Sequence, residues 1–217
     1  MTPYHKIYNV FDRDPETNYK TLIEGQFSRP EFGFLKDLQW DWTEKIDGTN
    51  IRVILEAGCV LRIRGRSDNA QIQPRLLSHL QETFSAKKLR EVFDTDAEVT
   101  LYGEGYGAKI QKGGGLYVAD GGVSFILFDV RVGKTWLERE SVESVASTLN
   151  IPHVPVLYRG TLLEAVGAVR CGFLSRVADH ARPAEGLVVR PSVGLMDRFG
   201  RRIIAKIKAV DFQEVTV

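Results

Sequence analysis

The sequence predicts an α+β fold in which antiparallel sheets carry flanking helices. Segments with the alternation of strands and segments with the spacing of helices follow one another along the 217 residues, without the regular strand–helix–strand rhythm of a parallel sheet. Hydrophobic residues make up 43% of the chain and charged residues 26%, which is typical of a globular protein. The length suffices for one large domain or two small ones. Because no linker-like tract divides the chain, we expect a single domain over residues 1–217.

The first segments are an irregular stretch with aromatic anchors, residues 1–38, and then a hairpin. Ile51, Val53 and Leu55 alternate with Arg52 and Ile54, and in residues 61–64 apolar and basic side chains alternate. Gly58 allows the turn between these two strands. If the second strand is regular, one of its faces carries Arg62, Arg64 and Arg66. Three cations on one face favour contact with phosphate, and the alternative is a solvated face.

The remaining elements alternate between helices and strands. Residues 76–84 have helical spacing, with Pro74 tolerated in the first turn. The spacing also predicts helices over 137–149 and 161–169, and Thr161 and Glu164 have the spacing of a capping box. Glycines 113–115 predict a flexible loop. Strands are predicted over 99–103, 123–132, 187–190 and 202–208, of which 123–132 is nearly all apolar and therefore buried.

Charge and cysteine usage limit the classes of function. The net charge of +1 excludes a uniformly basic nucleic-acid binder. Residues 182–208 nevertheless hold seven basic residues against two acidic ones, so local binding of phosphate is expected there. No apolar run approaches the length of a membrane span and the N-terminus lacks a secretory signal, so we expect no membrane. Cys59 and Cys171 are isolated, which predicts a reducing, cytoplasmic location with both as small core residues.

Three short runs carry the chemistry, and each lies beside a strand-like segment. In chain order they are Lys45-Ile46-Asp47-Gly48, Glu185-Gly186-Leu187-Val188-Val189-Arg190 and Lys206-Ile207-Lys208. Each run is weak evidence alone. Together they resemble the signature of the nucleotidyltransferases that carry a nucleotide on a lysine, a superfamily of DNA ligases, RNA ligases and mRNA capping guanylyltransferases. The resemblance implies a nucleotidyltransferase (ATP-grasp-like) domain of antiparallel sheets, over about residues 40–210.

A lysine nucleophile needs particular surroundings. A lysine amine is protonated at neutral pH, since its ordinary pKa is ~10.4, and nearby cations favour the neutral form. Lys206 and Lys208 are two apart on a predicted strand and would therefore point to a common site. Asp47, Glu104 and Glu185 would oppose them unless a metal neutralises these carboxylates. The residues thus predict a reaction that depends on a divalent metal. The alternative for Asp47 is that it is only a turn residue.

The resemblance assigns the reactive residues. It implies that Lys45 attacks the α-phosphate of ATP to form a covalent AMP adduct, with Mg²⁺ or Mn²⁺. The catalytic set it implies is Lys45, Asp47, Glu185, Lys206 and Lys208. The longer run Glu44-Lys45-Ile46-Asp47-Gly48-Thr49-Asn50 is similar to the lysine motif of the nick-sealing class of RNA ligases. It adds Glu44 and Asn50 to the residues expected to bind the nucleotide.

Further roles come from the same resemblance. Residues 64–71 resemble the next motif, whose arginine, here Arg66, contacts phosphate or ribose. Glu104 ends a strand like the one that binds ribose, and Phe128 is assigned to stacking on the base, with Phe125 as the alternative. Arg190 takes the place of a basic residue that helps to bind phosphate. The complete nucleotide-binding set is Glu44, Lys45, Asn50, Arg66, Glu104, Phe128, Glu185, Arg190, Lys206 and Lys208, and the metal set, acting through water, is Asp47, Glu104 and Glu185.

The sequence therefore predicts an ATP-dependent RNA ligase that joins a 3′-hydroxyl to a 5′-phosphate. Its expected substrates are RNA ends or a nicked duplex with RNA on the 3′-hydroxyl side. The alternatives are a small ATP-dependent DNA ligase, a guanylyltransferase, and an inactive nucleotide- or RNA-binding module. Only nine residues follow Lys208, so we expect no appended C-terminal OB-fold or other domain, which leaves open a protein partner that replaces it.

Overall fold

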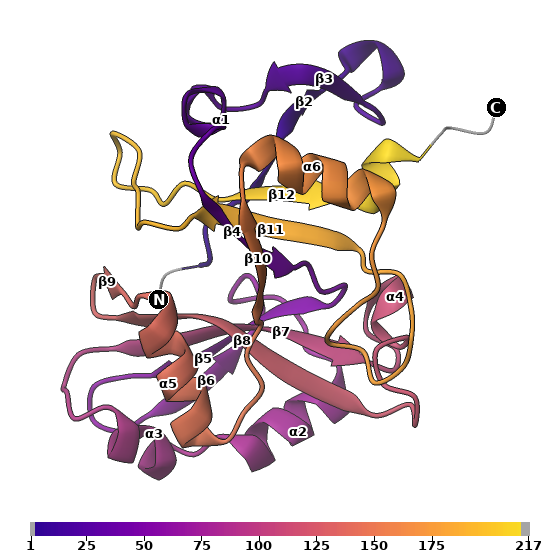
Figure 1. Cartoon of the computed structure of the whole chain (residues 1–217). Coiled ribbons are helices and arrows are strands. Elements are labelled where there is room, and N and C mark those ends of the chain that lie inside the picture. The colour runs from indigo at the N-terminus through magenta and orange to yellow at the C-terminus, as the bar shows by residue number, and fades with distance from the viewer. Residues whose placement is uncertain (1–2, 214–217) are drawn as a thin grey trace. The chain divides into compact units, whose positions relative to one another are not determined.

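The computed structural model describes residues 3–213 and has the α+β architecture with antiparallel sheets that the sequence predicts (Figure 1). The described residues form two compact units. Unit 1 comprises residues 3–4, 47–154 and 178–180, and unit 2 comprises residues 5–46, 155–177 and 181–213. The single domain predicted over 1–217 stays a prediction. No helix within residues 3–213 is long and apolar enough to cross a membrane.

Unit 1 is built on a five-stranded antiparallel sheet. The strand order is β6-β5-β7-β8-β9, with bounds Leu61–Arg64, Thr49–Leu55, Val99–Gly107, Val123–Val132 and Thr135–Trp136. Helices α2 (Pro74–Thr83), α3 (Ala86–Val92) and α5 (Arg139–Leu149) share one apolar core with this sheet. The short helix α4 covers Gln111–Gly114.

The strands of unit 1 have one apolar and one polar face. Ile51 and Val53 of β5 and Leu101 of β7 belong to the core beneath the helices. Because side chains alternate along a strand, Arg52 and its cross-strand neighbour Tyr102 lie on the opposite face. Both are fully buried. At these two positions the opposite face of the sheet is therefore covered, and it is partly polar.

Arg52 anchors the turn that follows β6. Its Nε donates to the Gly65 carbonyl at 2.8 Å, and its Nη2 donates to Asp68 at 2.8 Å. This hydrogen bond from Arg52 lowers the pKa of the Asp68 carboxyl below its usual value. A buried guanidinium with a backbone and a carboxylate partner holds residues 65–68 in place. The turn so held carries Arg66.

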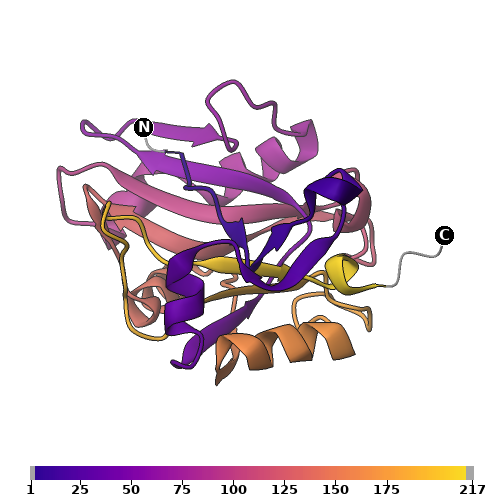
Figure 2. The same ribbon diagram turned by 90° about the horizontal axis from the view of Figure 1, so that it is seen from above.

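Unit 2 contains the second five-stranded sheet. Its order is β1-β12-β11-β4-β10, with bounds Tyr8–Asn9, Ala205–Lys208, Gly186–Pro191, Trp40–Glu44 and Val156–Gly160. All pairs are antiparallel except β1 with β12. Helix α6 (Leu162–Cys171) packs on β11 and β12, as Figure 2 shows. The capping box that begins α6 is formed by Thr161 and Glu164, as predicted.

The N-terminal part of unit 2 is more regular than the sequence predicts. Strands β2 (Phe11–Arg13) and β3 (Leu22–Phe27) form a hairpin around the 3₁₀ turn η1 (Pro15–Thr17), and helix α1 covers Pro30–Leu35. The expectation of an irregular segment over 1–38 is therefore wrong for these residues. A second 3₁₀ turn, η2 (Ala209–Phe212), follows β12. Apolar residues from β2, α1, β4, α6, β11 and β12 share the core of unit 2.

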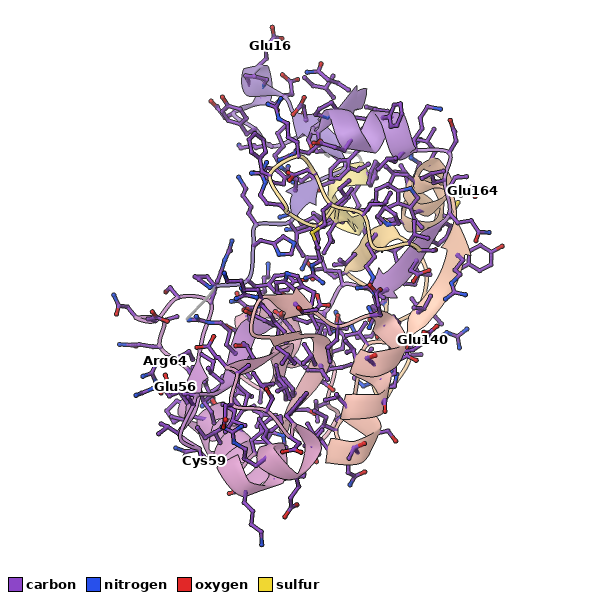
Figure 3. The ribbon with its side chains drawn as sticks, turned by 90° about the vertical axis from the view of Figure 1, so that its left-hand side faces the viewer. Glu16, Glu56, Cys59, Arg64, Glu140 and Glu164 are labelled. Carbon is purple, nitrogen blue, oxygen red and sulfur yellow. The ribbon has the colours of Figure 1, made fainter. Side chains whose placement is uncertain are left out.

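Three further expectations need correction. Glycines 113–115 do not form an open loop, because Gly113 and Gly114 lie in α4. Arg66 lies beyond the end of β6 and so does not share a regular strand face with Arg62 and Arg64. Cys59 and Cys171 are both exposed free thiols rather than core residues. Figure 3 shows Cys59 at the surface of unit 1 with Glu56 and Arg64.

We predict that Gly186→Ala destabilises the protein. At this position φ is +151°, and a Cβ would lie 2.0 Å from the Ile207 carbonyl oxygen of the neighbouring strand. The clash is with backbone, which cannot move without breaking the sheet, so we expect a loss of ~2–4 kcal/mol in the free energy of unfolding. Urea unfolding measures it.

Gly167→Ala is the matched control. Gly167 is an exposed residue of α6, and a Cβ there meets no atom within 4 Å. Replacing it should be neutral or should stabilise the protein by about 0.5–1 kcal/mol, because alanine favours the helix. Equal unfolding free energies for the two variants would contradict this account of Gly186.

We also predict that Arg52→Ala costs ~2–4 kcal/mol of unfolding free energy, because it removes a fully buried side chain and leaves the carbonyl of buried Gly65 without its donor. Arg62→Ala removes a half-exposed arginine that pairs with Glu56 on the surface and should cost no more than ~1 kcal/mol. Urea unfolding of both variants compares them. A loss for Arg52→Ala no larger than that for Arg62→Ala would show that Arg52 does not anchor the turn.

Candidate active site

Lys45 directly follows strand β4 and is held by both its backbone and its side chain. Its backbone N–H donates to the Gly186 carbonyl at 2.9 Å. Its Nζ donates to Glu185 Oε2 at 2.7 Å, and both side chains are 21% exposed. Lys45 and Glu185 are 140 positions apart in the chain, and the pairing of β4 with β11 brings them together. The first and second runs singled out in the sequence therefore meet in unit 2.

The third run lies next to the second. Strand β12 pairs with β11 so that Lys206 faces Val188 and Lys208 faces Gly186. Ala205 and Ile207 are buried in the core of unit 2, so Lys206 and Lys208 share the other face of the strand, as their spacing predicts. The absence of a Cβ at Gly186 permits the close approach of the Ile207 carbonyl.

Arg190 lies further along β11, opposite Asp41 of β4. Asp41 is 3% exposed and accepts hydrogen bonds from Arg159 at 2.9 Å and from Ser192 at 2.6 Å. This carboxylate lies at the end of β11 away from Glu185. Arg190 therefore lies on a polar surface of β11 and β4, several residues from Lys45.

Glu44 is the last residue of β4 and is 2% exposed. Its two carboxylate oxygens accept hydrogen bonds from Ser175 Oγ at 2.5 Å and from the Arg176 backbone N–H at 2.8 Å. Sequence reasoning missed Ser175 and Arg176, because no local pattern links them to a residue more than 130 positions away. In this structure Glu44 fixes the segment that follows α6.

The predicted site residues of unit 1 gather on the polar face of its sheet. Asn50 of β5 is directly opposite Glu104 of β7, and alternation from the core residue Ile51 places both on the face away from the helices. Gly48 approaches them so closely that a Cβ would lie 2.3 Å from the Gly105 carbonyl oxygen and 2.9 Å from Glu104. The glycine of the lysine motif is thus required by space.

Phe128 and Phe125 have different surroundings. Phe125 is 2% exposed, belongs to the core under the helices and meets Phe84 at 5.4 Å between ring centroids. Phe128 lies next to an irregularity in the pairing of β7 with β8 and is partly exposed. The Tyr4 ring meets Phe128 edge-on at 5.0 Å, and the Tyr4 hydroxyl donates to Asp129. Of the two phenylalanines, only Phe128 lies outside the apolar core.

Asp47 organises the glycine-rich turn of unit 1. Its Oδ2 accepts the Gly113 N–H at 2.8 Å, and its own N–H donates to the Tyr117 hydroxyl at 3.3 Å. A Cβ on Gly113 would lie 2.3 Å from Oδ2. Sequence reasoning missed this contact, although the run of glycines indicated a backbone in need of close approach.

Two of the predicted arginines lie in β6 and one lies in the turn that follows it. Arg66 is exposed in the turn held by Arg52. Arg62 pairs with Glu56 at 2.8 Å, and Arg64 donates to the Ile63 carbonyl. Arg62 is therefore already partnered by a carboxylate.

Two groups of predicted residues result. Unit 2 contains Glu44, Lys45, Glu185, Arg190, Lys206 and Lys208; unit 1 contains Asp47, Asn50, Arg66, Glu104 and Phe128. The chain passes from unit 2 to unit 1 between Ile46 and Asp47, inside the lysine motif. Within residues 3–213, no three His, Cys, Asp or Glu side chains are grouped to hold a metal ion. A metal would therefore need ligands from a bound phosphate or water besides one or two carboxylates, which is the usual coordination of Mg²⁺ at phosphates.

Comparison with solved structures gives the same fold. A Naegleria gruberi RNA ligase variant solved with ATP and Mn is 20% identical, with a TM-score of 0.63 over 82% of this chain and 52% of the other. A second variant of that ligase, also with ATP and Mn, is 18% identical, with a TM-score of 0.64 over 96% of this chain and 56% of the other. An archaeal ATP-dependent RNA ligase is 15% identical, with a TM-score of 0.62 over 98% of this chain and 49% of the other. The chain thus spans about half the length of these proteins.

The comparison with curated proteins found no match. A model of the RNA ligase family matches residues 39–208, which include all three runs. Those residues make up more than three quarters of the chain and contain both groups of candidate site residues. The chain therefore belongs to the RNA ligase family.

Proposed function

We propose that this chain is an ATP-dependent RNA ligase that carries AMP on Lys45. The observation that carries the proposal is the contact of Lys45 Nζ with Glu185 Oε2 at 2.7 Å, beside the strand that bears Lys206 and Lys208. Membership of the RNA ligase family supports it. The similar Naegleria structures contain ATP and Mn, which supports ATP as the nucleotide and Mg²⁺ or Mn²⁺ as the metal.

In the proposed first step, the Lys45 side chain gives a proton to solvent and its Nζ attacks the α-phosphorus of ATP. A second N–H proton passes to solvent as the phosphoramide forms. A P–N bond forms, the P–O bond to the β-phosphate breaks, and pyrophosphate leaves. Lys206 and Lys208 stabilise the negative charge that develops on the phosphates. Arg190 helps to bind phosphate in this proposal, and Arg66 contacts phosphate or ribose.

Glu185 accepts a hydrogen bond from Lys45 Nζ at 2.7 Å and must release it before the attack. The carboxylate oxygens of Glu185 are hard donors of the type that Mg²⁺ and Mn²⁺ prefer. A divalent cation, when bound, supplies positive charge at the phosphates and competes with the ammonium for Glu185. Asp47 and Glu104 complete the proposed set of carboxylates that act through water.

The polar face of unit 1 binds the nucleoside in this proposal. Glu104 accepts hydrogen bonds from ribose hydroxyls, and Asn50 is its cross-strand neighbour. Phe128 stacks on the base, a role supported by its place outside the apolar core in which Phe125 lies. Glu44, which the sequence predicts to bind the nucleotide, contributes to nucleotide binding in this proposal by holding Ser175 and Arg176 in place.

The later steps act on RNA. AMP passes from Lys45 to a 5′-phosphate, and a 3′-hydroxyl then attacks that phosphate and releases AMP. A small DNA ligase performs the same steps on DNA, a guanylyltransferase uses GTP instead, and an inactive binding module forms no adduct. A cytoplasmic location and a protein partner stay predictions.

We predict that incubation with ATP and Mg²⁺ gives a protein of increased mass, by one AMP, and that excess EDTA prevents it. Lys45→Arg keeps the charge next to Glu185 but lacks the nucleophile, so it should form no adduct. Lys36→Ala, which removes a partly exposed lysine of the same unit, should react like the unchanged protein. Intact-protein mass spectrometry with ATP or GTP measures all three and separates the guanylyltransferase. An AMP adduct on Lys45→Arg, or undiminished reaction in EDTA, would refute the assignment.

We further predict that a nicked duplex with ribonucleotides on the 3′-hydroxyl side is sealed faster than an all-DNA nick. The 2′-hydroxyls favour A-form geometry and distinguish RNA from DNA directly. Single-turnover sealing of pre-adenylylated nicks that differ only in those terminal sugars provides the measurement. Equal or faster sealing of the DNA nick would favour the DNA ligase.

A further inference from the structure

The loop between β11 and β12 presents an exposed aromatic ring with two guanidinium groups close to it. Phe199 is 65% exposed at the tip of this loop. The guanidinium carbons of Arg198 and Arg201 lie 4.7 Å and 4.9 Å from the centre of its ring. An exposed phenylalanine loses contact with water when a flat ligand stacks on it, and the two cations favour a ligand that carries negative charge.

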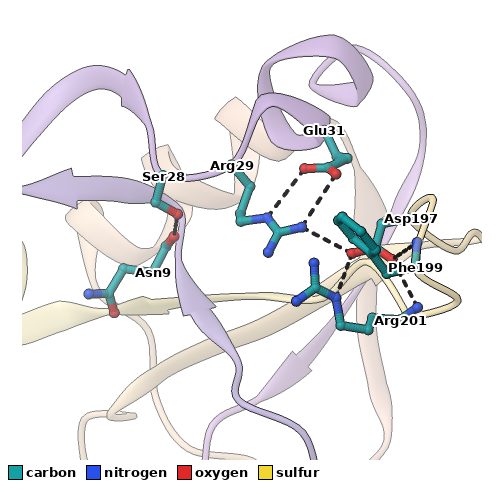
Figure 4. Close-up of polar contacts among 7 residues, drawn as sticks. All are labelled: Asn9, Ser28, Arg29, Glu31, Asp197, Phe199 and Arg201. Carbon is teal, nitrogen blue, oxygen red and sulfur yellow. Dashed lines mark hydrogen bonds and ion pairs between the residues drawn. The ribbon is translucent and has the colours of Figure 1, made fainter.

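The tip is held in one conformation by a buried carboxylate (Figure 4). One oxygen of Asp197 accepts the backbone N–H groups of Phe199 and Arg201 at 2.8 Å and 3.0 Å. The other accepts Arg201 Nε at 2.8 Å and Arg29 Nη2 at 3.0 Å. Burial opposes ionisation, but these donors outweigh it and bring the pKa of Asp197 to about 2. The carboxylate therefore stays charged at neutral pH, and the loop is ordered before any ligand arrives.

A cavity of about 140 Å³ adjoins the loop in unit 2. Its charged lining is mostly basic and includes Lys6, Arg29, Arg201 and Arg202, against Glu31 and Asp197. With Arg198 added, the surface has five cations and two carboxylates on a chain whose net charge is only +1. This local surplus of positive charge complements a phosphodiester backbone.

We propose that the loop of residues 196–202 and the adjoining cavity bind a strand of the RNA substrate, with a nucleobase on Phe199 and phosphates at Arg198 and the cavity cations. Aromatic side chains interleaved with cations are the usual platform for nucleic-acid strands. The inference rests on the proposed RNA ligase function for its ligand. It assigns a surface that the nucleotide chemistry at Lys45 does not use.

The surface is remote from the reacting groups within unit 2. Glu185 and Lys208 lie at one end of β11 and β12, and the loop joins the opposite ends. A six-residue strand spans about 20 Å, which corresponds to roughly six nucleotides at ~3.4 Å each. The loop would therefore bind RNA away from the joined ends and should have no effect on the reaction of Lys45 with ATP.

Fluorescence anisotropy tests the proposal, with the whole chain and a labelled single-stranded RNA, whose unpaired bases are free to stack on an aromatic ring. Phe199→Ala should weaken binding about five-fold or more with an unchanged dependence on salt, because a stacked base is lost. Arg198→Ala should weaken binding and also reduce the slope of log affinity against log salt by about 0.7–0.9, because one phosphate contact is lost. Phe199→Trp should restore the affinity.

Arg170→Ala is the matched control. Arg170 also lies over an aromatic ring, that of Phe212, and pairs with Glu24, but it belongs to α6. This variant should bind RNA like the unchanged protein. Thermal unfolding of each variant verifies that the exposed substitutions leave the fold intact.

The AMP adduct on Lys45 separates this inference from the proposed function. The Phe199→Ala and Arg198→Ala variants should form the adduct at the unchanged rate. An active wild-type ligase whose affinity for RNA is unaltered by either substitution would overturn the inference alone. Absence of both adduct and RNA binding in the unchanged protein would overturn both, and equal losses in Arg170→Ala would show a general effect of charge rather than a site.

Discussion

The reactive residues of unit 2 depend on the pairing of one strand, β11, with two partners. β4 on one side brings Lys45 to Gly186 and Glu185, and β12 on the other side brings Lys206 and Lys208. Backbone hydrogen bonds fix the register of each pair, and a shift by one residue would turn the lysines of β12 into the core. The geometry of the proposed nucleophile is therefore a property of the sheet rather than of a flexible loop.

In each unit the same division between an apolar and a polar face supports the site. In unit 1 the core residues of β5 and β7 face the helices, which leaves Asn50 and Glu104 on the other side. In unit 2, Ala205 and Ile207 face the core that includes α6, which leaves Lys206 and Lys208. Burial of the apolar face stabilises each sheet, and the alternating residues on the other face are the ones that the proposed chemistry uses.

Local patterns in the sequence predicted those parts of the fold that depend on local physics. Strand β8 has the predicted bounds 123–132, because a continuous apolar run needs no partner to be recognised. The capping box of α6 was predicted for the same reason, since Thr161 and Glu164 satisfy each other. The alternation of Lys206 and Lys208 was also readable.

Long-range contacts account for most of the rest. Strand β4 was not predicted, although its residues Trp40 to Thr43 alternate between apolar and polar side chains. Its polar residues are buried as well, because they bond to distant segments that local patterns do not reveal. The contacts of Glu44 with Ser175 and of Arg52 with Asp68 depend on how distant segments pack. Cys59 was expected in the core, but it lies in the exposed turn after β5, where its φ of +64° reflects turn geometry rather than burial.

Gly48 shows what a motif can encode besides reactivity. Lys45, three residues earlier in the motif, bears the amine. Gly48 has no side chain, and this absence leaves room for Glu104 and the Gly105 carbonyl. The two positions therefore contribute different properties, one the capacity for bond formation in the proposed reaction and one the close approach of two segments of chain. A descendant that loses the amine and keeps the glycine would retain an intact sheet and its polar face. Such a chain would still contain most of the residues of the lysine motif, and the replacement of the lysine alone would indicate that it is inactive.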